Sequence, residues 1–257
     1  VTQQGVIGKS YCYQTGAGAN LFFEGKNFNP FMSAGGTNVT IDDFNLNWDF
    51  DRGKHGFVGG YTIGSGFNSA LPIGYRPVPR GTPSWGKAWK AATAKWYQTA
   101  MNIGSSGSVM ANRYNYYALD PTYRNAFGLP LMRMTFDYKE NEHKIGRHAA
   151  EMVNAIAKSM SPTTFNPAAA RTEPWTVVPY QSTHNTGGTI MGTNPKNSAV
   201  NKYLQSWDCH NLFLIGANVF VHNAAYNPTG PVGALAYWTA DAIKNRYVKN
   251  PGPLVSA

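Results

Sequence analysis

Two polar residues in glycine-containing loops have the clearest chemical potential in this sequence. The first is His184, which precedes the segment Thr186-Gly187-Gly188-Thr189. Paired glycines let the backbone approach another group closely, and imidazole, with an ordinary pKa of about 6.5, can take a proton near neutral pH. A histidine in a loop is otherwise a surface or structural residue more often than not. His184 is therefore a candidate general base whose role depends on its surroundings.

The second residue is Asn227, in the segment Tyr226-Asn227-Pro228-Thr229-Gly230. A side-chain amide can donate a hydrogen bond to a substrate oxygen and orient it without competing as a base. The alternative is that Asn227 and Pro228 only form the turn before a helix. His222 lies in the same stretch of chain. The order of strand and helix places it outside the position of Asn227, although it could still line a pocket.

An apolar run and a helix must position these residues. The residues 212–215, Leu-Phe-Leu-Ile, predict a short buried strand. A helical pattern starts at Pro228, and proline suits a first turn because the missing amide proton is not needed there. The free amides of Thr229 and Gly230, with the helix dipole behind them, favour developing negative charge. The expected apolar face of this helix consists of Val232, Leu235, Ala236, Ala240, Ile243 and Tyr247.

The preceding residues predict antiparallel strands covered by two helices, an α+β arrangement. One helix has Ser84 as its N-cap and a tryptophan stripe on one face; the other ends at Ser161-Pro162. We expect the stripe, Trp85, Trp89, Ala92, Trp96 and Ala100, to be structural, and the second helix to bury Ile145, Ala149, Met152, Val153, Ile156 and Met160. Strands are expected at residues 21–23, 39–41, 56–63, 109–119 and 131–136, with a turn at Asp120-Pro121.

The composition excludes some classes of protein. The 257 residues are 42% hydrophobic, which is enough for a sizeable core. The sequence contains no run of eighteen apolar residues of the kind that spans a membrane. The net charge of +9 is scattered apart from Lys87, Lys90 and Lys95; a solvated surface or a face meeting an acidic partner explains it better than nucleic acid. Cys12 and Cys209 lack metal-ligand spacing, so we expect unpaired or buried thiols and no metal site.

The motif H-x-x-G-G-T-x-M-G, from His184 to Gly192, followed by a strand, a loop and a helix, resembles the C-terminal signature of the glucose–methanol–choline (GMC) flavoprotein oxidoreductases. Within that family the chain is most similar to the flavoprotein subunits of bacterial membrane-bound dehydrogenases of the gluconate, fructose and sorbitol type. The closer match rests on the segments 179–184, 203–208 and 226–230, and the resemblance runs from Gly8 to the C-terminus.

The resemblance implies an FAD-dependent oxidation of a hydroxyl group. In the family, the position of His184 is the base that takes the hydroxyl proton while hydride leaves for the flavin. The position of Asn227 is filled by histidine or asparagine, and here it is asparagine. The cofactor is expected against Gly216, Ala217, Asn218, Pro228, Thr229 and Gly230. Many relatives have an acidic residue where this chain has Gly216, so a side-chain contact to the cofactor is not expected at that position.

The G-x-G-x-x-G fingerprint that opens the family's FAD domain does not occur in this sequence. The resemblance therefore implies a C-terminal half. We expect residues 1–180 to be mostly substrate-binding domain, and residues 181–257 to be the last strand and helix of the FAD-binding domain. Without the dinucleotide-binding half, the chain alone should bind FAD poorly. Because it begins with Val1 rather than methionine, we expect this terminus to arise from processing or trimming.

Further expectations come from the resemblance alone. Related dehydrogenases lie on the periplasmic face of the bacterial cytoplasmic membrane, where a small subunit and a cytochrome c subunit pass electrons towards quinone. An iron–sulfur cluster, where present, would belong to the missing half. Gluconate as substrate would favour a cation such as Arg76, Arg113 or Arg133, whereas fructose or sorbitol would favour neutral donors. The competing hypothesis is a non-catalytic carbohydrate-binding or assembly module whose aromatic side chains stack on sugar rings.

Overall fold

The computed structural model of the chain describes residues 5–30, 39–45, 50, 52–67, 78–177 and 183–256. Arg76 and most of the segment 179–184 lie outside these residues. The chain forms two compact units, each built from separate stretches of sequence. Unit 1 comprises Val1–Gln14, Ser108–Lys139 and Pro174–Ala257, and unit 2 comprises Thr15–Gly107 and Glu140–Glu173. The functional division at residue 180 stays a prediction, and each unit is described by itself below.

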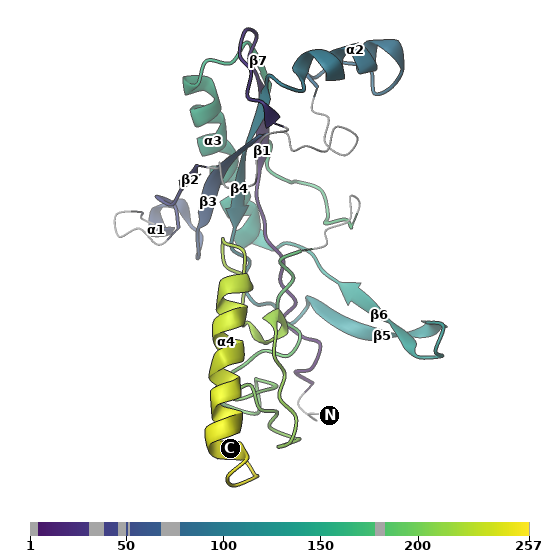
Figure 1. The fold of residues 1–257 in the computed structure, drawn as a ribbon, viewed down its shortest axis with the longest axis vertical. Coiled ribbons are helices and arrows are strands. Elements are labelled where there is room, and N and C mark those ends of the chain that lie inside the picture. Colours follow the sequence, from purple (N-terminus) through teal and green to yellow (C-terminus); the bar gives the residue numbers. More distant parts are fainter. Residues whose placement is uncertain are drawn as a thin grey trace. The chain divides into compact units, whose positions relative to one another are not determined.

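Unit 2 contains a five-stranded antiparallel sheet in the order β2-β3-β4-β1-β7, as Figure 1 shows. Its strands are β1 (Gly18–Phe22), β2 (Thr40–Ile41), β3 (Tyr61–Phe67), β4 (Ala100–Gly107) and β7 (Thr164–Asn166). In the central pair, Leu21 lies opposite Met101 and Ala19 opposite Ile103, so these apolar side chains share one face. The predicted strands at 21–23 and 39–41 are confirmed as β1 and β2 with shifted boundaries. Of the strand predicted at 56–63, only residues 61–63 are in a strand, β3, which continues to Phe67.

Helix α3 (Glu140–Ser159) covers the apolar face of this sheet. Ile145, Ala149 and Val153 recur every four residues and are fully buried, which confirms the amphipathic pattern predicted from the sequence. The helix begins five residues before Ile145, the first residue of the predicted apolar face, with Glu140 and Glu142 in its first turn, where carboxylates interact favourably with the helix dipole. A short helix, α1 (Arg52–His55), precedes β3.

Helix α2 (Gly86–Trp96) corrects two expectations. Its N-cap is Trp85, in an extended conformation and without a side-chain capping bond, so Ser84 is not the cap. Trp96 is buried and packs edge-on against Phe22 at 5.3 Å, but Trp85 is 82% exposed. The tryptophan stripe is thus only partly structural, because the sheet lies under the C-terminal end of the helix alone.

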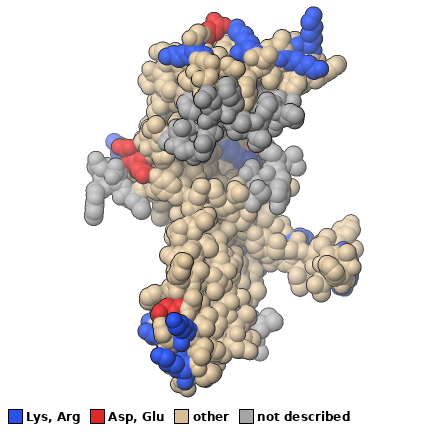
Figure 2. Space-filling view, in the orientation of Figure 1, with Lys and Arg blue, Asp and Glu red and all other residues tan. Residues whose placement is uncertain are grey.

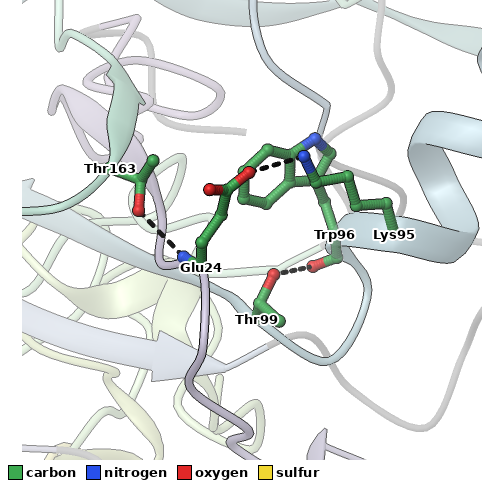
Figure 3. A network of polar contacts seen from close by, with 5 residues as sticks. All are labelled: Glu24, Lys95, Trp96, Thr99 and Thr163. Atoms are coloured by element: carbon green, nitrogen blue, oxygen red, sulfur yellow. Dashed lines mark hydrogen bonds and ion pairs between the residues drawn. The ribbon is translucent and has the colours of Figure 1, made fainter.

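A polar network fixes this C-terminal end of α2, as Figure 3 shows. The Lys95 ammonium lies 2.6 Å from a carboxylate oxygen of Glu24, and the backbone amide of Glu24 donates to the hydroxyl of Thr163. Both charged side chains are more than half exposed, so the pair contributes at most about 1 kcal/mol. Lys and Arg side chains gather over α2 in Figure 2, which agrees with the expected solvated basic face.

Unit 2 also holds a cluster of aromatic rings around His148. The hydroxyl of buried Tyr61 lies 2.6 Å from Nδ1 of His148, and the ring of His55 lies 4.1 Å from the His148 ring. Burial, and then the neighbouring His55, lower the pKa of His148, while Glu151 opposes this shift. Burial also raises the pKa of Tyr61, which therefore stays a neutral hydrogen-bond donor. The rings of Phe44, Phe50 and Phe57 complete the cluster.

We expect the stability of unit 2 to fall in mild acid because of His148. The unfolded chain binds a proton on this histidine below about pH 6.5, whereas the folded chain binds it only at lower pH. Stability should therefore rise with pH up to about 6.5 and be lost as the pH falls below that value. Thermal denaturation at several pH values should show a steeper acid loss for the wild type than for His148→Gln. Equal losses in both proteins would assign the acid sensitivity to other groups.

Unit 1 contains a hairpin of β5 (Tyr116–Arg124) and β6 (Pro130–Thr135), and a C-terminal helix, α4 (Thr229–Ala242). The strand predicted at 131–136 is confirmed as β6. The strand predicted at 109–119 is confirmed only at residues 116–119, where β5 begins, because residues 110–115 form a loop. The turn predicted at Asp120 is instead an irregularity within β5: its carboxylate accepts the amide hydrogens of Thr122 and Tyr123. These bonds hold the pKa of Asp120 below its usual value.

Helix α4 begins where the sequence predicts and continues into a π-helical turn, Ile243–Tyr247. Its predicted apolar face is confirmed in most positions: Val232, Leu235, Ala236, Ile243 and Tyr247 are half-buried, whereas Ala240 is exposed. Leu235 packs against a buried cluster of unit 1, and the fully buried residues of α4 are Thr239 and Ala242. Among the described residues, no helix combines the length and the apolar character that crossing a membrane requires. Cys12 is buried, and its thiol donates to the Ser10 carbonyl at 3.5 Å, whereas Cys209 is exposed. Neither residue forms a disulfide within the described part of the chain.

Candidate functional site

The histidine loop of unit 1 lies beside the N-terminal segment of the chain. The amides and carbonyls of Cys12 and Thr186 exchange two backbone hydrogen bonds, of 2.9 and 3.0 Å. The hydroxyl of Tyr11 donates to the side-chain oxygen of Asn185 at 2.5 Å. Burial and the neighbouring Tyr117 raise the pKa of Tyr11, so its hydroxyl remains protonated and keeps this contact. This antiparallel pairing brings Gln14 next to His184.

His184 is half-buried and held from two sides. Its ring Nδ1 lies 2.7 Å from the side-chain oxygen of Gln14, and its backbone carbonyl accepts a hydrogen bond from the side-chain amide of Asn223. Asn223 is itself buried and exchanges two backbone hydrogen bonds with Val109. His184 has a positive φ of 63°, which is uncommon for a residue with a side chain and typical of strained functional loops.

Gln14 connects His184 to the loop that precedes Asn227, and no sequence pattern predicts this role. Its side-chain amide donates to the carbonyls of Ala224 and Tyr226 at 3.0 and 2.9 Å. Tyr226 immediately precedes Asn227, which is exposed at the start of α4. Through Gln14, the structure therefore brings the His184 loop and the Asn227 loop together. The exposed His222 is not part of these contacts.

The glycine pair after His184 permits the close approach expected from the sequence. Gly187 has a φ of 82°, and a Cβ atom at this position would lie 1.9 Å from the carbonyl oxygen of Ser10. Gly188 has a φ of 105° and faces the ring of Tyr117. A side chain at Gly187 cannot be accommodated, because the obstacle is backbone rather than a flexible side chain.

Gly187→Ala should therefore destabilise unit 1 by roughly 3 kcal/mol or more, from backbone strain and displacement of Ser10. The matched control is Gly233→Ala within α4, where a Cβ meets no atom within 4 Å. The control should be neutral or stabilising by about 0.5–1 kcal/mol, since alanine favours helix. Denaturant unfolding of both variants measures the difference, and similar stabilities would show that the Gly187 loop relaxes freely.

The residues predicted to face the cofactor form two groups. Gly216–Asn218 lies directly against the glycine loop: Gly187 donates to the Ala217 carbonyl at 3.1 Å, and Thr189 donates to the Asn218 carbonyl at 3.0 Å. Residues 217–219 form a 3₁₀ turn. Gly216 has a φ of 146°, a conformation that favours glycine.

The second group is the start of α4. The N-cap Pro228 makes no side-chain capping bond, Thr229 and Gly230 are exposed, and nothing lies within 4 Å of a Cβ built on Gly230. Uncapped amides at the start of a 14-residue helix suit a polar or anionic edge of a bound group. These residues therefore fit the flavin contact that the sequence predicts for them.

The strand predicted at 212–215 is wrong in its regular form. The segment is extended but pairs with the chain along one edge, through the Phe213–Gln205 bridge and a bond from Leu214 to the Leu204 carbonyl. Leu212 and Ile215 remain 44% and 47% exposed. A single bridge and a few backbone bonds do not make the continuous ladder of a regular strand.

Two of the three arginines considered for a sugar acid are described in the structure. Arg113 lines a hollow of about 650 Å³ with Lys9, whose ammonium lies over the Tyr116 ring. Arg133 is exposed on β6. Neither contacts His184 among the described interactions, so no cation is assigned to the substrate.

Comparison with known proteins identifies the family to which this site is related. Residues 112–236 match the model of the C-terminal domain of the GMC oxidoreductases. The chain is 43% identical to the gluconate 2-dehydrogenase flavoprotein of Pantoea cypripedii, over 100% of this chain and 42% of that protein. It is 31% identical to the fructose dehydrogenase large subunit of Gluconobacter japonicus, over 56% of this chain and 25% of the relative.

Solved structures agree on the fold. Pyridoxine 4-oxidase from Mesorbium loti superposes with a TM-score of 0.52 over 95% of this chain and 44% of its own, at 10% identity. An Aspergillus oryzae formate oxidase superposes with a TM-score of 0.54 over 96% of this chain and 48% of its own, at 13% identity. The chain thus spans less than half the length of these proteins, and the predicted α+β fold is confirmed.

Proposed function

We propose that this chain, which matches the C-terminal domain of the GMC oxidoreductases, forms the catalytic half of an FAD-dependent dehydrogenase. The reaction is oxidation of a secondary hydroxyl of a sugar, polyol or sugar acid to a ketone. The observation that carries this proposal is the juxtaposition of His184 and the Asn227 loop through Gln14. A base and an amide donor beside one another are what removal of a hydroxyl proton requires.

Each residue has a separate role in this reaction. His184 takes the hydroxyl proton at Nε2, and the amide of Asn227 donates to the substrate oxygen, which holds the adjacent C–H bond in one orientation. Bound FAD supplies the acceptor for the hydride that leaves this carbon. The exposed amides of Thr229 and Gly230, at the uncapped start of α4, would hold the flavin edge on which negative charge develops.

The remaining expectations belong to the whole protein and are part of the proposal. The chain acts with an N-terminal dinucleotide-binding half, which carries any iron–sulfur cluster, and with a small subunit and a cytochrome c subunit. Electrons then pass towards quinone at the periplasmic face of the cytoplasmic membrane, with membrane attachment through the partners. Support comes from the relative described as a large subunit, a description that implies a smaller companion in that protein.

The substrate we favour is a sugar acid, specifically gluconate. The support is the difference between 43% identity over the whole chain with a gluconate 2-dehydrogenase flavoprotein and 31% identity over 56% of the chain with a fructose dehydrogenase subunit. A non-catalytic carbohydrate-binding module is not favoured, because the histidine loop is built with strain and buried support that stacking on sugars does not need.

Anaerobic mixing of the intact flavoprotein with candidate substrates tests this function. Gluconate should bleach the flavin absorbance in a single turnover, and fructose and sorbitol should do so more slowly or not at all. If fructose or sorbitol is faster, the reaction class stands and the substrate changes. If none of the three reduces a fully loaded flavin, the dehydrogenase proposal for these substrates fails.

A further inference from the structure

We propose that Gln14 is a positioning residue that fixes the tautomer of the His184 ring and holds the Asn227 loop beside it. The proposal rests on the proposed role of His184 as a base. Gln14 and His184 are 170 residues apart in sequence, yet their side chains meet at 2.7 Å. The same side chain makes the contacts to Ala224 and Tyr226.

The contacts of Gln14 determine which of its two side-chain atoms faces the histidine. Backbone carbonyls only accept hydrogen bonds, so the pair at Ala224 and Tyr226 requires the NH₂ group of Gln14. The side-chain oxygen is then left to face Nδ1 of His184. Rotating the amide by half a turn would place that oxygen against two carbonyl oxygens and lose both donors.

The orientation of Gln14 fixes the tautomer of His184. An amide oxygen only accepts, so Nδ1 of His184 must carry the hydrogen, and the lone pair of the neutral ring lies on Nε2. Nε2 is therefore ready to take a proton. When it does, Nδ1 still donates to Gln14, so the contact is kept in both charge states.

Gln14 is itself held in place before any ligand arrives. The hydroxyl of Tyr138 donates to the Gln14 backbone carbonyl at 2.8 Å, and Tyr138 is only 9% exposed. Two residues earlier, Cys12 is buried and pairs with Thr186. Backbone support of this kind lets a half-buried side chain keep one rotamer, which positioning of a catalytic group requires.

A neutral orienting group also has a consequence for the pKa of the base. A carboxylate facing Nδ1 would stabilise the imidazolium and raise the pKa of His184, and a cation would lower it. Gln14 does neither. Substituting this one residue by glutamate or lysine should therefore move the histidine limb of the pH–rate profile in opposite directions.

The two substitutions also separate the two sets of contacts. Gln14→Glu keeps an acceptor for His184 but loses the donors to the Ala224 and Tyr226 carbonyls. Gln14→Lys keeps a donor for those carbonyls but loses the acceptor. Gln14→Met fills similar volume with neither. Exposed Gln98 provides matched controls, Gln98→Glu and Gln98→Lys, with the same changes of charge.

The experiment measures the rate of flavin reduction against pH in the intact, FAD-loaded flavoprotein, with flavin content and melting temperature recorded for each variant. Gln14→Glu should move the histidine limb to higher pH and Gln14→Lys to lower pH, each by roughly one unit. Gln14→Met should lower the rate about 10-fold or more through loss of the fixed tautomer. Both Gln98 variants should keep the wild-type profile.

A limb that stays at the wild-type pH in Gln14→Glu and Gln14→Lys, together with a full rate in Gln14→Met, overturns the proposal. If a charged variant does not fold, Gln14→Met and the remaining charged variant decide. His184→Ala separates this failure from failure of the proposed function. If His184→Ala is active, His184 is not the base and the proposed function fails. If His184→Ala is inactive but the Gln14 variants leave the pH–rate profile unchanged, only the positioning role of Gln14 fails.

Discussion

Replacing His184 with alanine in the intact flavoprotein is expected to lower the rate of substrate-driven flavin reduction by about 10²- to 10⁴-fold. The reason is that alanine leaves no group to take the hydroxyl proton, so the substrate alkoxide becomes costly to form. FAD content should stay at the wild-type level, because the groups that we propose to face the cofactor lie elsewhere, at residues 216–218 and at the start of α4. Stopped-flow absorbance under anaerobic conditions measures the rate.

The control is His210→Ala, which removes an exposed histidine of the same unit. It should reduce flavin at the wild-type rate. A His184→Ala enzyme within a few-fold of wild type would contradict the assignment of the base. A loss of FAD in that variant would instead assign His184 to cofactor binding.

Replacing Asn227 with aspartate is expected to have the second-largest effect, a fall in turnover of roughly 10²-fold. The neutral donor becomes a carboxylate that repels the developing negative charge on the substrate oxygen. The backbone that begins α4 is unchanged, so flavin should remain bound. Steady-state kinetics with a dye acceptor, alongside the flavin-to-protein ratio, separates the two effects.

Asn250→Asp makes the same chemical change at an exposed position in the C-terminal segment and should leave turnover unchanged. If Asn227→Asp keeps full activity, the asparagine is only the turn residue before the helix, which is the alternative that the sequence leaves open. If it loses flavin, Asn227 belongs to the cofactor site.

Helices with a regular apolar period were the most predictable part of the fold. The spacing of Ile145, Ala149 and Val153 identified α3 because all three face one sheet. The face of α4 was predicted with one error. Val232, Leu235 and Ala236 lie on the half-buried side that the sequence predicts. Ala240 is exposed and the polar Thr239 beside it is buried, which a pattern of apolar residues alone does not indicate.

Strand prediction failed where local pattern and tertiary pairing disagree. Residues 109–119 contain tyrosines at strand-like spacing, but pairing with β6 starts only at Tyr116, opposite Thr135. Residues 212–215 have the apolar composition of a buried strand, but one edge of this segment has no partner among the described residues. Both outcomes depend on neighbours distant in sequence, which a local pattern does not contain.

The candidate site was predictable in its loops but not in the contacts between them. His184, the glycine pair and Asn227 stand out by residue type and motif, and the approach of Gly187 to Ser10 shows why glycine is required there. Gln14 was missed because a single glutamine after two tyrosines and a cysteine carries no local signal. Its role appears only when residues 14, 184 and 226 meet in unit 1.

The most direct test of the central claim is single-turnover reduction of the intact flavoprotein by gluconate, with hydrogen or deuterium on the carbon that is oxidised. Hydride transfer from a CH–OH group predicts that the flavin is reduced without any other electron donor and that deuterium slows this step. His184→Ala should abolish the fast reduction of the flavin by gluconate with either hydrogen or deuterium on that carbon. A fully loaded flavin that stays oxidised with gluconate, fructose and sorbitol, or that is reduced equally fast by His184→Ala, would contradict the account.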